Sequence, residues 1–123
     1  MTNIIDLTNG YNGAGVYALV DEKGMPYIGS SVNVRKRLKE HNFNIGQAKI
    51  GNPTGFSNPK LDEASYRGEV FAAIVLYKLP IGAQRCSLRE AERYYAALVG
   101  SIGDTYNCLK VGNRCLGDEK PTI

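Results

Sequence analysis

The sequence predicts a single α/β domain, and three observations support this class. The chain has 123 residues, of which 43% are hydrophobic and 22% are charged, as expected for one ordinary globular domain. A β-hairpin pattern near the N-terminus is followed by helical and strand patterns in alternation. Neither a repeat nor a low-complexity linker separates these patterns. We therefore expect residues 1–123 to form one domain.

The hydropathy and cysteine patterns restrict the class of protein further. The longest apolar run, residues 70–77, has eight residues, whereas a membrane-spanning helix needs roughly 20. Residues 1–10 lack the basic and apolar regions of a secretory signal, so we expect a cytoplasmic protein without a membrane partner. The cysteines are odd in number and lack C-x-x-C spacing, which argues against a disulfide framework and against a zinc ribbon.

The first predicted element is a β-hairpin. Residues 14–20 (AGVYALV) and 26–29 (PYIG) are rich in β-branched and aromatic residues and flank a DEKG turn. A helix should follow, because Ser30 or Ser31 can accept a hydrogen bond from the free backbone N–H groups of its first turn. We expect this helix to run to about Asn42.

The middle of the chain predicts a loop and a short helix. Residues 44–58 contain three glycines, a proline and several asparagines, which is typical of a long loop. Pro59 fits the first turn of a helix, where its missing N–H costs nothing. This helix should run to about Tyr66 and end at Gly68.

The last third of the chain predicts a buried strand and a second long helix. The strand covers residues 70–79 and ends at Pro80. Ser87 and Glu90 have the spacing of a capping box, so the helix should begin at Ser87. From Gly100 the pattern is irregular.

Each long helix places a charged side chain where its pattern requires an apolar one. The apolar stripe of the first helix consists of Val34, Arg37, Leu38 and His41, so Arg37 should be partly desolvated. Glu92 lies on the apolar stripe of the second long helix in the same way. Both side chains therefore need an explanation.

Two explanations are open. Arg37 and Glu92 can form a buried ion pair with each other, although such pairs stabilise a fold little because both ions lose their hydration. Alternatively, they line a cleft. A lone carboxylate holds Mg²⁺ together with waters and a substrate phosphate, and arginine is well shaped to bind phosphate. The cleft would suit phosphodiester hydrolysis better than acyl transfer, because the chain has no G-x-S-x-G motif.

The basic residues are concentrated in one segment. The net charge of the chain is only +3, but residues 30–60 carry six cations against one anion, a local charge of +5. This favours an anionic partner such as a nucleic acid, although a solvated helix face is an alternative. The cations are Arg35, Lys36, Arg37, Lys39, Lys49 and Lys60.

The hairpin carries a family resemblance. Gly15-Val16-Tyr17 and, after nine intervening residues, Tyr27-Ile28-Gly29 resemble the paired signature of the GIY-YIG nuclease family, with Val in place of the first Ile. Arg37 follows Tyr27 by ten residues and His41 lies one turn further, as the family pattern requires. Downstream landmarks also fit, and they are Asn58-Pro59-Lys60-Leu61, Phe71, Glu92-Arg93-Tyr94-Tyr95 and Tyr106-Asn107.

The resemblance covers residues 14–109 and is closest to the phage and intron homing endonuclease branch. It implies a small α/β (α+β) domain in which helices flank a three-stranded antiparallel sheet, with the active site on one face of the sheet. Residues 110–123 should form an irregular tail, too short for a separate DNA-reading domain. Two alternatives stay open: a homodimer would cut both strands, and a targeting partner would supply the sequence specificity.

The resemblance also implies a mechanism, the hydrolysis of DNA with one divalent cation per active site. Glu92 should hold Mg²⁺ or Mn²⁺, and Arg37 should neutralise charge on the phosphate. Tyr17 is the candidate general base, which requires nearby cations to lower the pKa of its phenol from about 10. Tyr27 should bind the attacking water or the phosphate, His41 should position or deprotonate Tyr17 or the water, and Asn107 should brace the site.

The remaining candidates are expected to contact DNA. Gly29 should allow a phosphate to approach the backbone closely. The others, Ser30, Arg35, Lys36, Lys49 and Lys60, should contact phosphates. Two alternatives are a non-catalytic binding or interaction module on the same scaffold and an RNA nuclease. A binding module would have no use for an inward-facing Glu92, so Glu92→Ala distinguishes it from an enzyme.

Overall fold

The computed structural model describes residues 3–52, 59–101, 103 and 105–107. The expected tail and the second part of the expected loop lie outside these residues. None of the described helices is long and apolar enough to span a membrane. The elements are β1 (Ile4–Asp6), β2 (Gly15–Val20), β3 (Pro26–Ser31), α1 (Val34–Lys49), α2 (Pro59–Tyr66), β4 (Phe71–Lys78) and α3 (Arg85–Gly100).

The strands form one mixed sheet in the order β1-β4-β2-β3. Strand β2 is antiparallel to both β3 and β4, which are the three strands expected from the sequence. The prediction of a three-stranded antiparallel sheet is nevertheless wrong by one strand, because β1 pairs with β4 in parallel. Ile4 of β1 lies opposite Phe71 and is only 3% exposed, so this short strand covers an edge of the core.

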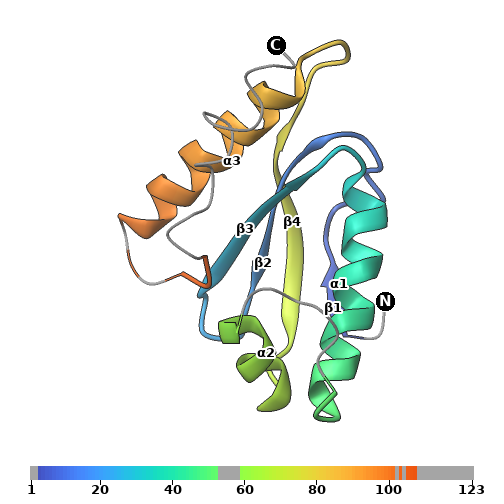
Figure 1. Ribbon diagram of the computed structural model, residues 1–123, viewed down its shortest axis with the longest axis vertical. Coiled ribbons are helices and arrows are strands. Elements are labelled where there is room, and N and C mark those ends of the chain that lie inside the picture. The colour runs from blue at the N-terminus through green and yellow to red at the C-terminus, as the bar shows by residue number, and fades with distance from the viewer. Residues whose placement is uncertain (1–2, 53–58, 102, 104, 108–123) are drawn as a thin grey trace.

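Helices cover both faces of the sheet (Figure 1). Successive side chains of a strand point to opposite faces, and β2 is apolar on both. Tyr17 and Leu19 of β2 pack with residues of α1 and α2 in one hydrophobic cluster. Val16 and Ala18 pack with residues of α3 in the other. Strand β3 is an outer strand of this sheet, with α1 on one side and α3 on the other.

Helix α1 begins later than expected. Ser30 and Ser31 belong to β3, and the helix is capped by Asn33, whose side chain accepts a hydrogen bond from the backbone N–H of Lys36 at 3.0 Å. The expectation of a serine cap is therefore wrong. Asparagine fills the same role because its short side chain also places an oxygen next to the free backbone N–H groups of the first turn.

Helix α1 also ends later than expected. It runs to Lys49, so the first part of the loop expected over residues 44–58 is helical. Ile45 and Ala48 are buried and continue the apolar stripe of the helix. Packing of these side chains against the core outweighs the low helix propensity of the asparagine and glycine residues nearby.

Helix α2 and strand β4 lie where the sequence predicts them, whereas α3 begins two residues early. Its N-cap is Gln84, which makes no side-chain capping bond, and Ser87 lies within the helix. The expected capping box is therefore wrong. Cys86 in the first turn is disulfide-bonded, against the expectation from cysteine spacing.

Candidate active site

A buried tyrosine and a buried histidine form the centre of the candidate site. Tyr17 of β2 and His41 of α1 are each 1% exposed, and the Tyr17 hydroxyl lies 2.7 Å from His41 Nε2. The ring of Tyr27 on β3 packs edge-on against the His41 ring at 5.7 Å. The hairpin and α1 thus bring together three of the predicted catalytic residues.

Gly29 makes room for this arrangement. It lies opposite Tyr17 in the β2–β3 register, and a Cβ at this position would lie 2.6 Å from the Tyr17 hydroxyl oxygen. Real Cβ atoms do not approach other atoms so closely, so a side chain here would displace the Tyr17 ring. The group that lies against Gly29 in the structure is the Tyr17 phenol, and the expected approach of a phosphate to Gly29 stays a prediction. The absence of a side chain at Gly29 leaves room for the Tyr17 ring.

Burial dominates the ionisation of this pair. It raises the pKa of Tyr17 above its usual value, and the nearby charge of Arg37 only partly opposes this. We expected neighbouring cations to lower the pKa, and that expectation is wrong because desolvation is the larger effect. Burial, assisted by Arg37, also lowers the pKa of His41 to about 3. Both side chains are therefore neutral at pH 7.

Arg37 lies on the solvent-exposed side of the site. Its side chain is 44% exposed, and its Nη1 lies 2.9 Å from Glu40 Oε1, one turn along α1. The buried ion pair between Arg37 and Glu92 is therefore not formed. Burial opposes the charge of Arg37, but Glu40 and Tyr17 outweigh it and raise its pKa. Because Arg37 influences the pKa of Tyr17 and also that of Glu92, it lies near both groups.

Glu92 reaches the site from α3. Ser30 Oγ donates a hydrogen bond to Glu92 Oε1 across the β3–α3 interface. Burial raises the pKa of Glu92, although Ser30 and the charges of Arg89 and Arg37 oppose this rise. The predicted contact of Ser30 with DNA stays a prediction, while the structure makes Ser30 the partner of Glu92. Sequence reasoning missed this because the contact joins residues far apart in the chain.

Glu92 fits the requirements of a divalent cation. Its second oxygen, Oε2, makes no hydrogen bond to any described residue, and Glu92 forms no ion pair within this part of the chain. A hard cation would offset the burial of the carboxylate, and Mg²⁺ readily keeps waters as its other ligands. The described residues contain no group of three or more potential metal-binding side chains. Such a site therefore rests on one carboxylate.

The two halves of the site lie on opposite faces of the sheet. Tyr17 and Gly29 face α1, whereas Ser30, the next residue along β3, faces α3 and Glu92. The resemblance implied a site on one face. The halves meet around β3 because β3 is an edge strand of the described sheet. On the side away from β2 it pairs with no further strand.

Asn107 ties the end of the described chain to β3. Its side-chain oxygen accepts a hydrogen bond from the N–H of Ile28 at 2.8 Å, and its amide nitrogen donates to the Ile28 carbonyl at 2.7 Å. Tyr106 adds a hydrogen bond from its N–H to the Pro26 carbonyl. These contacts hold the strand that carries Tyr27 and Gly29.

The predicted DNA-contacting cations are dispersed. Arg35 lies near Gly10 and Asp6, on a different side of α1 from Arg37. Lys49 is about 18 Å from Arg37 along the helix axis, at 1.5 Å per residue. Lys60 donates to the Thr105 carbonyl at 3.4 Å. Of this group only Lys36, which is exposed beside Arg37, lies close to the site.

These observations define an α/β domain that gathers a tyrosine pair, an imidazole, a guanidinium and a carboxylate around one outer strand. The GIY-YIG catalytic domain family matches residues 13–107, and the chain belongs to this family. The match identifies a nuclease domain and implies a nucleic-acid substrate. No curated protein and no solved structure matches the chain.

Proposed function

We propose that the protein is a divalent-metal-dependent DNA endonuclease. The observation that carries this proposal is the placement of Glu92 and Arg37 on either side of β3, next to the buried Tyr17–His41 pair. This arrangement provides a cation ligand, Glu92, and a phosphate-binding group, Arg37, whose side chain is partly exposed to solvent. The aromatic residues that follow Glu92 support membership of the homing endonuclease branch, whose substrate is DNA.

Glu92 and Arg37 would act directly on the scissile phosphate. Glu92 would hold one Mg²⁺ or Mn²⁺ ion, which when bound supplies Lewis-acid stabilisation of charge on the phosphate and the leaving oxygen. Arg37 would exchange its exposed contact with Glu40 for a phosphate oxygen, because a guanidinium binds phosphate through several donors. Arg37 thereby neutralises charge that develops in the transition state.

Tyr17 would orient the attacking water. When the Tyr17 O–H donates to His41 Nε2, the phenol oxygen can accept a hydrogen bond from water. Burial keeps Tyr17 protonated, so the water can pass its proton to Tyr17 only as Tyr17 passes its own to His41. His41 is a weak base in this position, so the relay contributes less to the rate than Glu92 and Arg37.

Cleavage of supercoiled plasmid DNA tests the proposal. We expect nicked or linear DNA with Mg²⁺, none with EDTA, and none with Glu92→Ala, which should still bind DNA. Glu90→Ala is the matched control, because Glu90 is exposed on the same helix and should leave cleavage unchanged. A protein that binds DNA but never cuts it would support a non-catalytic module, and cleavage of RNA alone would contradict the choice of DNA.

The product of this assay also reports on partners. A single active site cuts one strand, so nicked circles are expected from a monomer. Linear product that appears without accumulation of nicked circles would support a homodimer. Cleavage without sequence preference would support targeting by a partner protein.

A further inference from the structure

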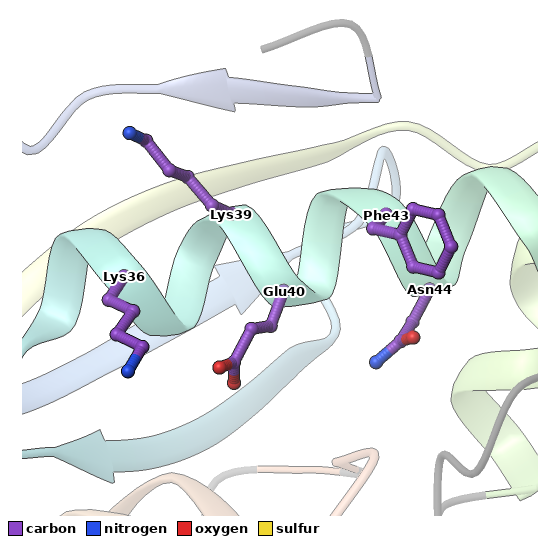
Figure 2. A pocket seen from close by; sticks show the side chains of 5 residues that line it. All are labelled: Lys36, Lys39, Glu40, Phe43 and Asn44. Carbon is purple, nitrogen blue, oxygen red and sulfur yellow. The ribbon is translucent and has the colours of Figure 1, made fainter.

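The outer face of α1 carries a hollow that the proposed mechanism does not use (Figure 2). It is a shallow and open hollow of about 430 Å³. We call it the α1 hollow, and its lining consists of Lys36, Lys39, Glu40, Phe43 and Asn44.

Phe43 is the unusual member of this set. Its side chain is 58% exposed, and it lies on the side of α1 opposite the buried stripe, so the core does not use it. A single exposed apolar residue is ordinary. Here, however, Phe43 shares the lining of the hollow with Lys39, one turn earlier on α1, and with Lys36, two turns earlier. Figure 2 shows these two lysines extending to different sides of the helix.

An aromatic ring next to cations is the combination that binds unpaired nucleotides. Bases stack on aromatic faces whatever their identity, while lysines contact the phosphates on either side. Glu40 weakens this attraction once Arg37 leaves it for a phosphate, because its carboxylate then faces the same hollow. The two lysines still outnumber Glu40, so the α1 hollow keeps a net positive charge.

One contact links the α1 hollow to the candidate active site. Glu40 forms part of the wall of the hollow and contacts Arg37, which belongs to the site. Phe43 follows Arg37 by six residues, about 9 Å along the helix axis. Phe43 also lies about 120° around the helix from Arg37, at about 100° per residue, so a base on Phe43 would lie a few nucleotides from the scissile phosphate.

We propose that the α1 hollow binds an unpaired nucleobase of the DNA strand that is cut, stacked on Phe43, with the adjoining phosphates on Lys36 and Lys39. This inference rests on the proposed function and names its substrate class, DNA with unpaired nucleotides within a few nucleotides of the cleaved phosphate. A base inside a continuous duplex cannot use the site, because its neighbours in the stack cover both of its faces.

Fluorescence anisotropy with two labelled DNA molecules tests the inference. One is a continuous duplex, and the other is the same duplex with a small bulge of unpaired nucleotides. The Glu92→Gln protein is used for binding, so that the DNA is not cut. In this background Phe43→Ala should bind bulged DNA about 5- to 150-fold more weakly and bind the duplex unchanged. Phe43→Trp should restore binding of the bulged DNA.

Tyr94→Ala is the matched control. Tyr94 is an exposed aromatic residue on α3, on the other face of the sheet, and its loss should affect neither DNA. The inference would be overturned if Phe43→Ala and Tyr94→Ala bound bulged DNA equally well. It would also be overturned if Phe43→Ala lost the same affinity for the bulged DNA and for the continuous duplex. The proposed function fails separately, if the wild-type protein cuts neither DNA with Mg²⁺.

Discussion

The two sides of β3 contribute to the candidate site in different ways. On the α1 side, Tyr17 and His41 are buried, neutral and joined by a hydrogen bond. On the α3 side, Glu92 is partly buried, ionisable and bonded to Ser30. The first group is held by the same packing that stabilises the sheet. The second is available for an ion, because one carboxylate oxygen has no described partner.

This difference separates the effects of substitutions. A change to Tyr17 or His41 should disturb both folding and chemistry, because both side chains are part of the core. A change on the α3 side should disturb chemistry alone, because removing a desolvated carboxylate does not weaken the core. Four substitutions or conditions test the comparison.

The largest expected effect is that of Glu92→Gln on cleavage. The rate should fall at least about 1,000-fold, because the bound cation contributes several kcal/mol to transition-state stabilisation. Stability should not fall. The raised pKa means that Glu92 favours the folded state only at pH below its unfolded pKa, and this contribution is lost as pH rises through the folded pKa. Single-turnover cleavage and urea unfolding at pH 7 measure both effects, and a marked loss of stability would contradict the comparison.

Arg37→Ala should reduce the rate about 100- to 1,000-fold, the usual effect of removing one preorganised charge-stabilising group. Arg37 is half-exposed, so the free energy of unfolding should change little. Glu40→Gln is the matched control. It removes the partner of Arg37 without removing the guanidinium, and it should leave the rate within a few-fold of wild type. Equal losses for both variants would mean that the ion pair, and not Arg37 itself, is required.

Gly29→Ala should destabilise the protein by about 1–3 kcal/mol, because the new methyl group overlaps the Tyr17 ring. The displaced ring should also lower the cleavage rate. Gly100→Ala is the control, since no atom lies within 4 Å of a Cβ there. Urea unfolding compares the two, and an unchanged stability for Gly29→Ala would mean that Tyr17 can move without cost.

The smallest expected effect is the pH dependence due to His41. Its folded pKa of about 3 lies below the usual value, so its contribution to stability is present above pH 6.5 and is lost as pH falls toward 3. The slope should approach about 1.4 kcal/mol per pH unit below pH 6. Urea unfolding between pH 7 and pH 5 should show this slope in the wild type and a shallower one in His41→Gln. Parallel curves would contradict a buried neutral His41.

The sequence predicted most of the fold because its signals are local. The hairpin, α2 and β4 each have turn residues at their ends and apolar residues between them. Strand β1 lacked such a signal, because three residues form a strand only when β4 offers a partner. The late end of α1 was readable from Ile45 and Ala48, but the intervening glycine and asparagines outweighed them in the prediction.

For the site, the sequence predicted which residues take part but not which residues they contact. The helical stripes singled out Arg37 and Glu92, and the hairpin singled out Tyr17. The partners of these groups depend on tertiary structure, as with Ser30 and Glu92, and no sequence pattern indicates such a contact. Glu40 is the exception, because its spacing of three residues from Arg37 on a helix predicts an ion pair.

The most direct test of the account is the position of Mn²⁺ in crystals of the protein with a DNA oligonucleotide, located by anomalous scattering. The account predicts Mn²⁺ about 2.1 Å from a Glu92 oxygen, with the scissile phosphate between the ion and an Arg37 side chain that has left Glu40. An ion bound away from Glu92, or a phosphate on one side of β3 only, would contradict it.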